Sequence, residues 1–364
     1  MADSYDIAIV GAGMAGASLA AELAGHANVV LLEAEAQPGY HATGRSAAFW
    51  TESYGGPGVQ PLTTASGPYL KENGFLRARG ALTIARHDQE TGLRAFAREF
   101  SDRGVRVDLL DRQDLEHRIP GILPGWTLGA LEPDCSDIDV AALHQHYLAQ
   151  ARKAGASLQT SARLDSAVDL GNRWRCTISD HREITCSILV NAAGAWADPV
   201  ATAAGVRPLG IVPLRRTVAQ LRVAPAPPAE LPLVLDYGES FYFKPEAGRL
   251  WLSPHDEEPS LPCDAAAEEL DVALAIDRLG GVVDWRVEQV EHRWAGLRSF
   301  SPDRLPVYGF DRQAPRFFWF AGQGGFGIQT APAAARLAAA LIRNEPPGAI
   351  DPAPFSPWRF GALR

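Results

Sequence analysis

The sequence predicts an α/β fold that begins with a strand–helix–strand unit. Three observations support it: an apolar run at Tyr5–Val10, an alanine-rich stretch that reaches about Gly25, and a second apolar run at Val29–Leu32. The first run and the alanine-rich stretch are joined by Gly11-Ala12-Gly13-Met14-Ala15-Gly16. A GxGxxG turn between a strand and a helix, followed by a second strand, is the dinucleotide-binding fingerprint.

Each glycine of this turn has a predicted role. Gly11 is expected to allow the tight turn, Gly13 to let the backbone approach a pyrophosphate, and Gly16 to permit close packing of helix on strand. The N–H groups that begin the helix would face the phosphates. Glu33 ends the second strand, where a carboxylate can accept hydrogen bonds from ribose hydroxyls. We therefore predict a nucleotide site rather than a plain glycine-rich turn.

Composition limits the class of protein. The length of 364 residues suggests two domains, and 46% hydrophobic residues exclude a disordered or fibrous chain. The net charge of -9 argues against nucleic acid as a partner, since phosphate binding needs a basic surface. Only three of the 34 cationic residues are lysines, a bias that we attribute to background composition.

The sequence also bears on the cellular compartment. No signal peptide is evident, and the glycines and Glu22 in the apolar stretch Ile7–Leu23 favour a strand–turn–helix over a transmembrane segment. The four cysteines are far apart and form no CxxC pair, so buried free thiols are expected, with a Cys176–Cys186 disulfide as the open alternative. We expect a soluble, cytoplasmic protein.

The fingerprint does not by itself separate FAD from NAD. The segment Gln37–Ala48 is polar, then small, as expected of a loop leading into a helix, and it offers hydroxyls of Thr43 and Ser46 with Arg45 near the first phosphate site. The longer FAD molecule needs a second phosphate-contacting loop there. An ordinary capped helix start explains the segment equally well.

Motifs along the whole chain resemble the D-amino-acid oxidase superfamily of FAD-dependent oxidoreductases. Within it the resemblance is closest to D-arginine dehydrogenases, with glycine oxidase and sarcosine oxidase as more distant relatives. The matching stretches occur in the expected order: Gly11–Gly16, Glu33, Gln37–Ala48, Leu189–Trp196, Gly205–Gly210, Glu239–Tyr242, Trp294–Phe300 and Gln323–Thr330. The resemblance implies FAD as the cofactor.

Non-covalent binding of FAD is expected, because Gly322–Gly327 contains no cysteine. His41 is the one candidate for a covalent link near the N-terminal loop, and a hydrogen-bonding or surface role is preferred for it. The positions that the resemblance gives to the cofactor are Gly11, Gly13, Ala15, Gly16, Glu33, Thr43, Gly44, Arg45, Ser46, Ala47, Ala48, Ala193, Gly194, Trp196, Arg298, Gly324, Gly325, Phe326, Gly327, Ile328, Gln329 and Thr330.

The resemblance further implies a Rossmann-like FAD-binding domain interleaved with an α+β substrate domain on a mixed sheet. The FAD-binding domain would comprise residues 1–78, 139–205 and 301–364, and the substrate domain residues 79–138 and 206–300. Apolar patterns predict a helix over Thr330–Arg343 and strands near Ala81–Ile84, Ile184–Val190, Val218–Leu221, Phe241–Phe243, Arg249–Leu252 and Phe317–Ala321. The proline-rich end from Glu345 is expected to wrap the surface or to be partly disordered.

The resemblance also implies a substrate site. An arginine is the natural bidentate partner of a substrate carboxylate, and Arg298 matches the arginine with that role. Tyr242 and Arg216 match two further carboxylate contacts, although one residue of slip would exchange Arg216 with Arg215. Tyr54 matches a tyrosine on a mobile loop over the active site, where neighbouring glycines would permit a lid.

Two departures from the relatives bear on the substrate. Phe49 stands where D-arginine dehydrogenases have a histidine, and no acid is found around Arg79-Gly80-Ala81, where they have the glutamate that binds the substrate guanidinium. A cationic substrate side chain would be uncompensated there. We expect oxidation of a D-amino acid with an apolar, aromatic or small side chain by hydride transfer to flavin N5, and hydrolysis of the imino acid to a keto acid and ammonia.

Several alternatives stay open. The same site could serve a 2-hydroxy acid, or the chain could be a flavin-bound partner without turnover of its own. The electron acceptor could be oxygen or a quinone. No metal site is expected, because His144 and His146 point to different faces of a helix and His255-Asp256-Glu257 indicates a polar loop after a strand.

Overall fold

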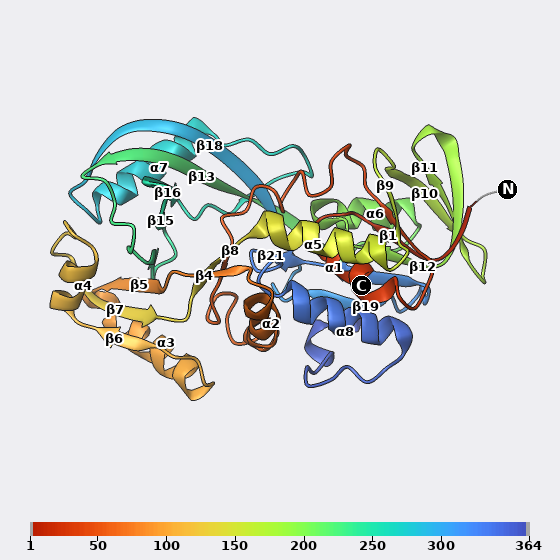
Figure 1. Cartoon of the computed structure of the whole chain (residues 1–364), viewed down its shortest axis with the longest axis horizontal. Helices are drawn as coiled ribbons and strands as arrows, with labels where there is room; N and C mark the ends of the chain where they lie inside the picture. The colour runs from red at the N-terminus through yellow and green to blue at the C-terminus, as the bar shows by residue number, and fades with distance from the viewer. Residues whose placement is uncertain (1–2, 362–364) are drawn as a thin grey trace.

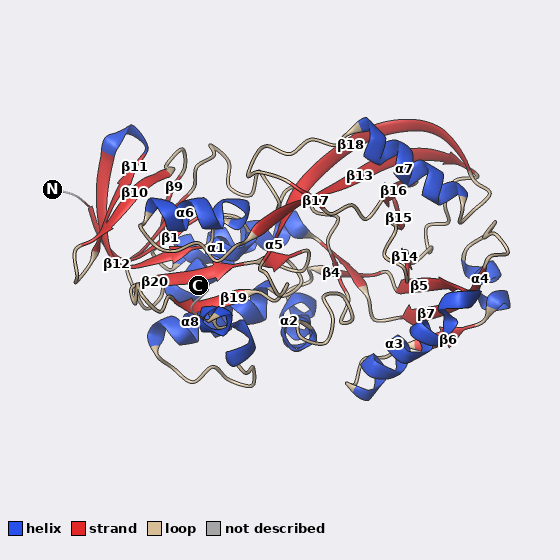
Figure 2. Ribbon diagram, turned by 180° about the vertical axis from the view of Figure 1, so that it is seen from behind, coloured by secondary structure: helices blue, strands red, loops and turns tan. Residues whose placement is uncertain are grey.

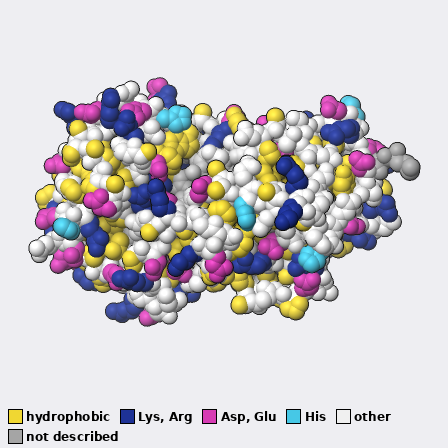
Figure 3. Space-filling model, viewed as in Figure 1, with side chains coloured by type: hydrophobic (Ala, Val, Ile, Leu, Met, Phe, Trp, Pro, Cys, Tyr) yellow, Lys and Arg dark blue, Asp and Glu magenta, His cyan; other side chains and the backbone are white. Residues whose placement is uncertain are grey.

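The computed structural model describes residues 3–361 and shows an elongated molecule with two halves side by side (Figure 1). One half is built on a largely parallel sheet covered by helices, and the other on a mixed sheet with long curved strands. On the face seen in Figure 3, acidic and basic side chains are interspersed rather than gathered into one basic area. In the described residues, no helix is long and apolar enough to cross a membrane.

The first half holds the predicted strand–helix–strand unit. Its central strands run in the order β9-β2-β1-β12-β20, all parallel, and β10 and β11 extend β12 as an antiparallel hairpin. The strands of this sheet are β1 (Asp3–Val10), β2 (Val29–Leu32), β9 (Ser157–Gln159), β10 (Leu164–Asp169), β11 (Trp174–Ile178), β12 (Arg182–Asn191), β19 (Val307–Phe310) and β20 (Phe317–Ala321).

The side chains of β1 alternate between the two faces of the sheet, and helices cover both faces. Ile7 and Ile9 face one hydrophobic core with helices α1, α5 and α8, whereas Ala8 and Val10 face a second core with helix α6. The helices of the chain are α1 (Met14–Leu23), α2 (Gln60–Glu72), α3 (Glu90–Asp102), α4 (Arg112–Arg118), α5 (Val140–Lys153), α6 (Ala197–Ala203), α7 (Glu269–Gly280) and α8 (Ala331–Arg343).

The second half is a mixed sheet in the order β21-β18-β13-β16-β15-β14-β5-β7-β6, with β17 paired to β13. The long strands β13 and β18 pair antiparallel and curve from the junction of the two halves to the far end of the molecule (Figure 2). The strands are β5 (Ala81–Arg86), β6 (Asp108–Leu110), β7 (Trp126–Glu132), β13 (Val212–Ala224), β14 (Leu233–Asp236), β15 (Tyr242–Glu246), β16 (Arg249–Ser253), β17 (Glu258–Pro259), β18 (Arg286–Phe300) and β21 (Gln323–Gly324).

A small sheet links the halves and corrects one prediction. The helix expected after Gln37–Ala48 does not form; turns are followed by β3 (Phe49–Trp50), which pairs with β8 (Ser136–Ile138), as does β4 (Leu76–Ala78). Pairing of β3 with a distant strand satisfies backbone groups that a helix would otherwise satisfy locally. Local composition gave no sign of this partner.

The α/β fold class is confirmed, and apart from the helix expected after Gln37–Ala48 the structure has the predicted strands and the predicted helix at Thr330–Arg343. All four cysteines are free, three of them buried, so the Cys176–Cys186 disulfide is absent. The proline-rich end wraps the first half, with Phe355 buried against Tyr308. Because each large sheet collects strands from segments far apart in the sequence, we propose to keep the predicted interleaved domain boundaries.

Candidate active site

One cavity of about 820 Å³ runs between the two large sheets. The lining includes Tyr54, Arg216, Tyr242 and Arg298 from the predicted substrate site. From the predicted cofactor site it includes Gly11, Gly13, Ala15, Glu33, Thr43, Arg45, Ser46, Ala47, Ala48, Ala193, Gly194, Trp196, Gly324, Gly325, Gly327, Ile328 and Gln329. The fold therefore brings residues that span most of the chain to one continuous space.

The glycine turn is built for close packing. Gly11 has a φ of +99°, and a Cβ there would lie 2.6 Å from the carbonyl oxygen of Ala192. A Cβ on Gly16 would lie 1.8 Å from the carbonyl oxygen of Gly11. Helix α1 can approach β1 this closely only because Gly16 has no side chain.

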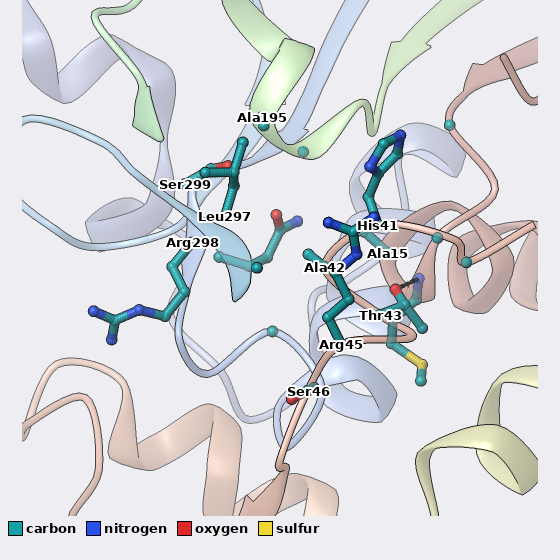
Figure 4. A pocket seen from close by; sticks show the side chains of 18 of the residues that line it. Ala15, His41, Ala42, Thr43, Arg45, Ser46, Ala195, Leu297, Arg298 and Ser299 are labelled. Carbon is teal, nitrogen blue, oxygen red and sulfur yellow. Dashed lines mark hydrogen bonds between the residues drawn. The ribbon is translucent and has the colours of Figure 1, made fainter. Parts of the chain in front are cut away.

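Side chains from other segments complete this end. Thr43 accepts a hydrogen bond at Oγ1 from the Met14 N–H (3.0 Å), and Glu33 accepts one from the Ala12 N–H (2.9 Å). Glu33 thus orders the turn through one oxygen while its side chain lines the cavity. Figure 4 shows Thr43 and His41 on one side of this space, with Arg298 extending from β18 on the other.

Four residues predicted to contact the cofactor do not line the cavity. Gly16 packs α1 onto the turn, and the Gly44 N–H donates to the Gly39 carbonyl. Phe326 belongs to a hydrophobic cluster with Phe300, and Thr330 donates its hydroxyl to the Phe326 carbonyl at the start of α8. These four residues pack behind the cavity wall. A sequence motif alone does not distinguish a residue that supports the wall from one that lines the cavity.

Arg45 forms an ion pair that the sequence did not predict. Its guanidinium binds the Asp264 carboxylate and donates to the Ala265 carbonyl (2.7 Å). Arg45 therefore holds the loop before α7 at the cavity, and its contact with the cofactor stays a prediction. Asp264 lies 219 residues further along the chain, beyond the reach of any local pattern.

His41 lies in the cavity wall beside Trp196, with ring centroids 4.6 Å apart. Its Nε2 is 2.9 Å from Glu35 Oε1, while its Nδ1 is buried without a hydrogen-bond partner among the described residues. A polar atom left unpaired at a cavity wall is a place where a bound molecule can complete a hydrogen bond.

The substrate arginines lie at the other end of the cavity. Arg298 on β18 is directly opposite Leu214 on β13, and Arg216 is two residues further along the same strand. Because alternate residues of a strand share a face, Arg216 and Arg298 point to the same side of the sheet. Arg215 points to the other side, where it binds Glu268 and Asp271. Arg216 lines the cavity and Arg215 does not, so Arg216 stays the predicted carboxylate contact.

Both guanidinium groups are buried with donors left over. Arg216 is only 6% exposed. Among the described residues its Nη2 has no hydrogen-bond partner, and neither has Nε of Arg298. Burial and the positive charge of Arg298 lower the pKa of Arg216. Burial also opposes ionisation of Arg298, but Tyr54 and Glu257 outweigh it and raise the pKa of that group. Each guanidinium therefore keeps one N–H donor without a hydrogen-bond acceptor among the described residues.

Two tyrosines flank the arginines. The Tyr54 hydroxyl accepts a hydrogen bond from Arg298 Nη1 (3.2 Å), and the Tyr242 ring lies 5.8 Å from the Arg216 guanidinium carbon. Gln329 donates to the Tyr54 carbonyl (3.1 Å) and so fixes the base of the Tyr54 loop to the start of α8. Gly55 and Gly56, both at positive φ, follow in this loop. Its opening as a lid stays a prediction.

The sequence predicted a polar loop at His255–Glu257, and the structure has one, but His255 also lines the cavity. Its Nδ1 is 2.7 Å from the Glu239 carbonyl oxygen, so Nδ1 carries the proton and Nε2 is left as an acceptor. Burial, then the charges of Arg216 and Arg298, lower the pKa of His255 to about 3. A neutral imidazole thus lies beside the arginines.

Neutral His255 predicts a loss of stability in acid. Between about pH 6.5 and pH 3 the unfolded chain binds a proton at this residue that the folded protein does not, so the free energy of unfolding falls as the pH falls. Urea unfolding should show that, between pH 7 and pH 4.5, the free energy of unfolding falls by about 2 kcal/mol less in His255→Asn than in the wild type. Equal losses in the two proteins would contradict the lowered pKa.

A buried carboxylate near the substrate end also escaped sequence reasoning. Glu132 on β7 is opposite Ala81 in the sheet and 5% exposed. It accepts hydrogen bonds from the Thr51 hydroxyl (2.9 Å) and from the Ser53 hydroxyl and N–H. Burial raises its pKa. Glu132 is not part of the cavity lining, so it supports the segment before Tyr54 rather than a substrate group.

Among the described residues no cluster of histidine, cysteine and carboxylate side chains could hold a metal ion. His144 is buried in α5, and its Nε2 lies 2.8 Å from the Ala12 carbonyl oxygen behind the glycine turn. Burial lowers its pKa. His144 therefore has a structural partner on the cofactor side of the fold.

The residues present fit FAD. The cavity is elongated enough to be lined at one end by Arg163 and Ser179 and at the other by Arg298 and Tyr242, with the glycine turn between them. Gly13, which caps α1, supplies no side chain to the N–H groups that begin the helix. Thr43 accepts a hydrogen bond from the Met14 N–H, and the remaining N–H groups of this helix start favour a pyrophosphate. His41 Nδ1, which has no hydrogen-bond partner among the described residues, offers a further polar contact.

Comparisons with known proteins agree with this reading. The family model described as "FAD dependent oxidoreductase" (DAO) matches residues 6–341. The hydrogen cyanide synthase subunit HcnC of Pseudomonas aeruginosa is 24% identical over 98% of this chain and 96% of its own length. Glycine oxidase from Geobacillus kaustophilus superposes with a TM-score of 0.85 at 22% identity, over 97% of this chain and 98% of its own.

L-proline dehydrogenase from P. horikoshii has a TM-score of 0.86 at 19% identity, over the whole of both chains. At these identities the structural likeness shows a shared fold. The family match covers most of the chain and confirms the prediction of an FAD-dependent enzyme. The protein is therefore an FAD-dependent oxidoreductase, and it belongs to the DAO family.

Proposed function

We propose that the protein oxidises a D-amino acid with an apolar or small side chain to the corresponding imino acid, which water then converts to a keto acid and ammonia. The observation that carries the amino acid assignment is the pair of buried, unpaired guanidinium donors on Arg216 and Arg298. A substrate carboxylate supplies the acceptors that these donors lack. The D configuration rests on the resemblance of the sequence motifs.

Bound FAD would supply the hydride acceptor at flavin N5. The chain's own residues then have three tasks. Arg298 and Arg216 bind the carboxylate, and Tyr54 and Tyr242 hold the two guanidinium groups in place. His255, neutral and with a free Nε2, can accept a hydrogen bond from the substrate amine without holding its proton, which therefore passes to solvent.

The side-chain pocket is apolar. Phe49, Val218 and Leu235 line the cavity near the Tyr242 ring, and the Phe49 and Tyr242 rings lie 6.3 Å apart. In the described lining the carboxylates are Glu33 and Glu35, both at the nucleotide end. A guanidinium or ammonium on the substrate side chain would therefore be desolvated beside Phe49 without a counter-charge.

A panel of D- and L-amino acids tests this proposal. We expect D-amino acids with small, aliphatic or aromatic side chains to reduce the flavin at least about a hundredfold faster, in kcat/KM, than D-arginine or D-lysine. The measurement is bleaching of flavin absorbance under anaerobic conditions. A preference for D-arginine would contradict the pocket, and reduction by 2-hydroxy acids alone would contradict amine oxidation. Absence of bleaching by any donor would favour a flavin-bound partner without turnover.

Two further points stay proposals. Reoxidation after air or a soluble quinone is admitted would identify oxygen or a quinone as the electron acceptor. The free, buried thiols of Cys135, Cys176 and Cys186 support a reducing compartment, which we propose to be the cytoplasm.

A further inference from the structure

Glu257 places a carboxylate of the protein against the substrate arginines. Its Oε1 lies 2.8 Å from Arg298 Nη2, 2.8 Å from Arg304 Nη2 and 3.7 Å from Arg216 Nη2. The Glu257 side chain is 33% exposed and that of Arg304 53%, compared with 12% for Arg298. The contact therefore lies on the solvent side of the buried arginines.

The donors of the two buried arginines divide into two sets. Arg298 Nη2 binds Glu257, whereas its Nε has no hydrogen-bond partner within residues 3–361. Arg216 donates from Nε to the Asp256 carbonyl (2.9 Å), whereas its Nη2 has no hydrogen-bond partner in the same part of the chain. One set is thus left for a substrate carboxylate, and a second anion position, between Arg298 and Arg304, is already filled by Glu257.

Charge makes the second position selective. Arg216, Arg298 and Arg304 are opposed in this region by Asp256, 3.8 Å from Arg216, and by Glu257. Without Glu257 the site would hold one more uncompensated positive charge, placed where an added carboxylate could bind Arg298 Nη2 and Arg304 Nη2. With Glu257 present, a second substrate carboxylate meets a like charge in the position that it needs.

We propose that Glu257 is a specificity-determining residue that restricts the enzyme to substrates with a single carboxylate. Its own carboxylate occupies the position that a second substrate carboxylate would take. This inference rests on the proposed carboxylate site at Arg216 and Arg298.

Charge removal at Glu257 tests the inference. In Glu257→Gln, kcat/KM for acidic amino acids divided by kcat/KM for neutral ones is expected to rise at least about tenfold. Aspartate is compared with alanine, and glutamate with norvaline, each as the D- and the L-enantiomer. Glu257→Asp keeps the charge and should keep the low ratio. Glu257→Ser, which removes the carboxylate altogether, should change the ratio in the same direction as Glu257→Gln.

Glu268→Gln is the matched control, because Glu268 pairs with Arg215 on the opposite side of β13. Its ratio should equal that of the wild type. Should Glu257→Gln fold poorly, Glu257→Ser gives the same comparison. An unchanged ratio in a folded charge-removing variant, or a wild type that already oxidises aspartate as well as alanine, would overturn the inference.

Binding of carboxylates that cannot be oxidised separates this inference from the proposed function. The dissociation constants of acetate and malonate can be measured from the change in flavin absorbance. In Glu257→Gln the affinity for malonate should rise relative to the affinity for acetate. If no amino acid reduces the wild-type flavin, the proposed function fails, whereas the malonate-to-acetate ratio still decides the role of Glu257. A ratio equal in wild type and variant would refute that role.

Discussion

Replacing Arg298 by glutamine is expected to lower kcat/KM for amino acid oxidation about a thousandfold. The Arg298 guanidinium extends from β18, is buried and donates to the Tyr54 hydroxyl. Arg216 on the neighbouring strand β13 points to the same side of the sheet. Glutamine removes the charge, leaves Glu257 without its buried partner and cannot bind a carboxylate through two parallel N–H groups. The measurement is the rate of anaerobic flavin reduction as a function of amino acid concentration.

The effect should appear in substrate binding and turnover. Arg215→Gln is the control: Arg215 precedes Arg216 directly, but its side chain points to the other side of β13, toward Glu268 and Asp271. A loss in Arg215→Gln as large as that in Arg298→Gln would show that general stability, rather than the carboxylate contact, explains the result.

Replacing Gly16 by alanine is expected to destabilise the protein by about 3 kcal/mol or more and to abolish most FAD binding. Helix propensity favours alanine over glycine by about 1 kcal/mol, so propensity alone predicts a stabilised α1. The added Cβ, however, would lie 1.8 Å from the Gly11 carbonyl oxygen and 3.3 Å from Ile9 Cγ2. The Gly11 carbonyl and the Ile9 side chain are held in place by β1 and the turn that follows it. Helix α1 must therefore shift outward, and the turn must shift with it.

Gly25→Ala is the matched control, because a Cβ at Gly25 would meet no atom within 4 Å and the residue lies just beyond the same helix. Its stability and FAD content should stay near wild type. FAD content from the absorbance spectrum and thermal unfolding of each purified protein provide the comparison. Full FAD occupancy in Gly16→Ala would contradict the close packing of α1 on the turn.

Much of the fold follows from local patterns. The runs at Ile7–Val10, Val29–Leu32 and Phe317–Ala321 are buried parallel strands, as their length and apolar residues predict. The segment Gln37–Ala48 is a loop as predicted, but the helix expected after it was wrong, because Phe49–Trp50 pairs with the distant strand β8. Propensity describes a segment alone, and here long-range pairing determines the outcome.

The candidate site shows the same division. The sequence motifs predicted Arg298, Tyr242 and Tyr54, and the structure brings them to one cavity. His255 was missed as a cavity residue because its position depends on a left-handed backbone at φ +54° and on a hydrogen bond to the Glu239 carbonyl. A single histidine in a polar loop carries no spacing signal for either feature.

The pairing of β21 with β18 sets the distance between the two ends of the site. Gly324 in the turn that lines the predicted cofactor space is hydrogen-bonded in register with Ser299, the residue next to Arg298. The proposed carboxylate-binding arginine and the turn of the predicted cofactor site thus lie on paired strands, whereas Phe49 and Leu235, which are proposed to face the substrate side chain, lie on β3 and β14. Substrate range can therefore diverge in evolution by substitution of those residues while the reacting carbon keeps its alignment.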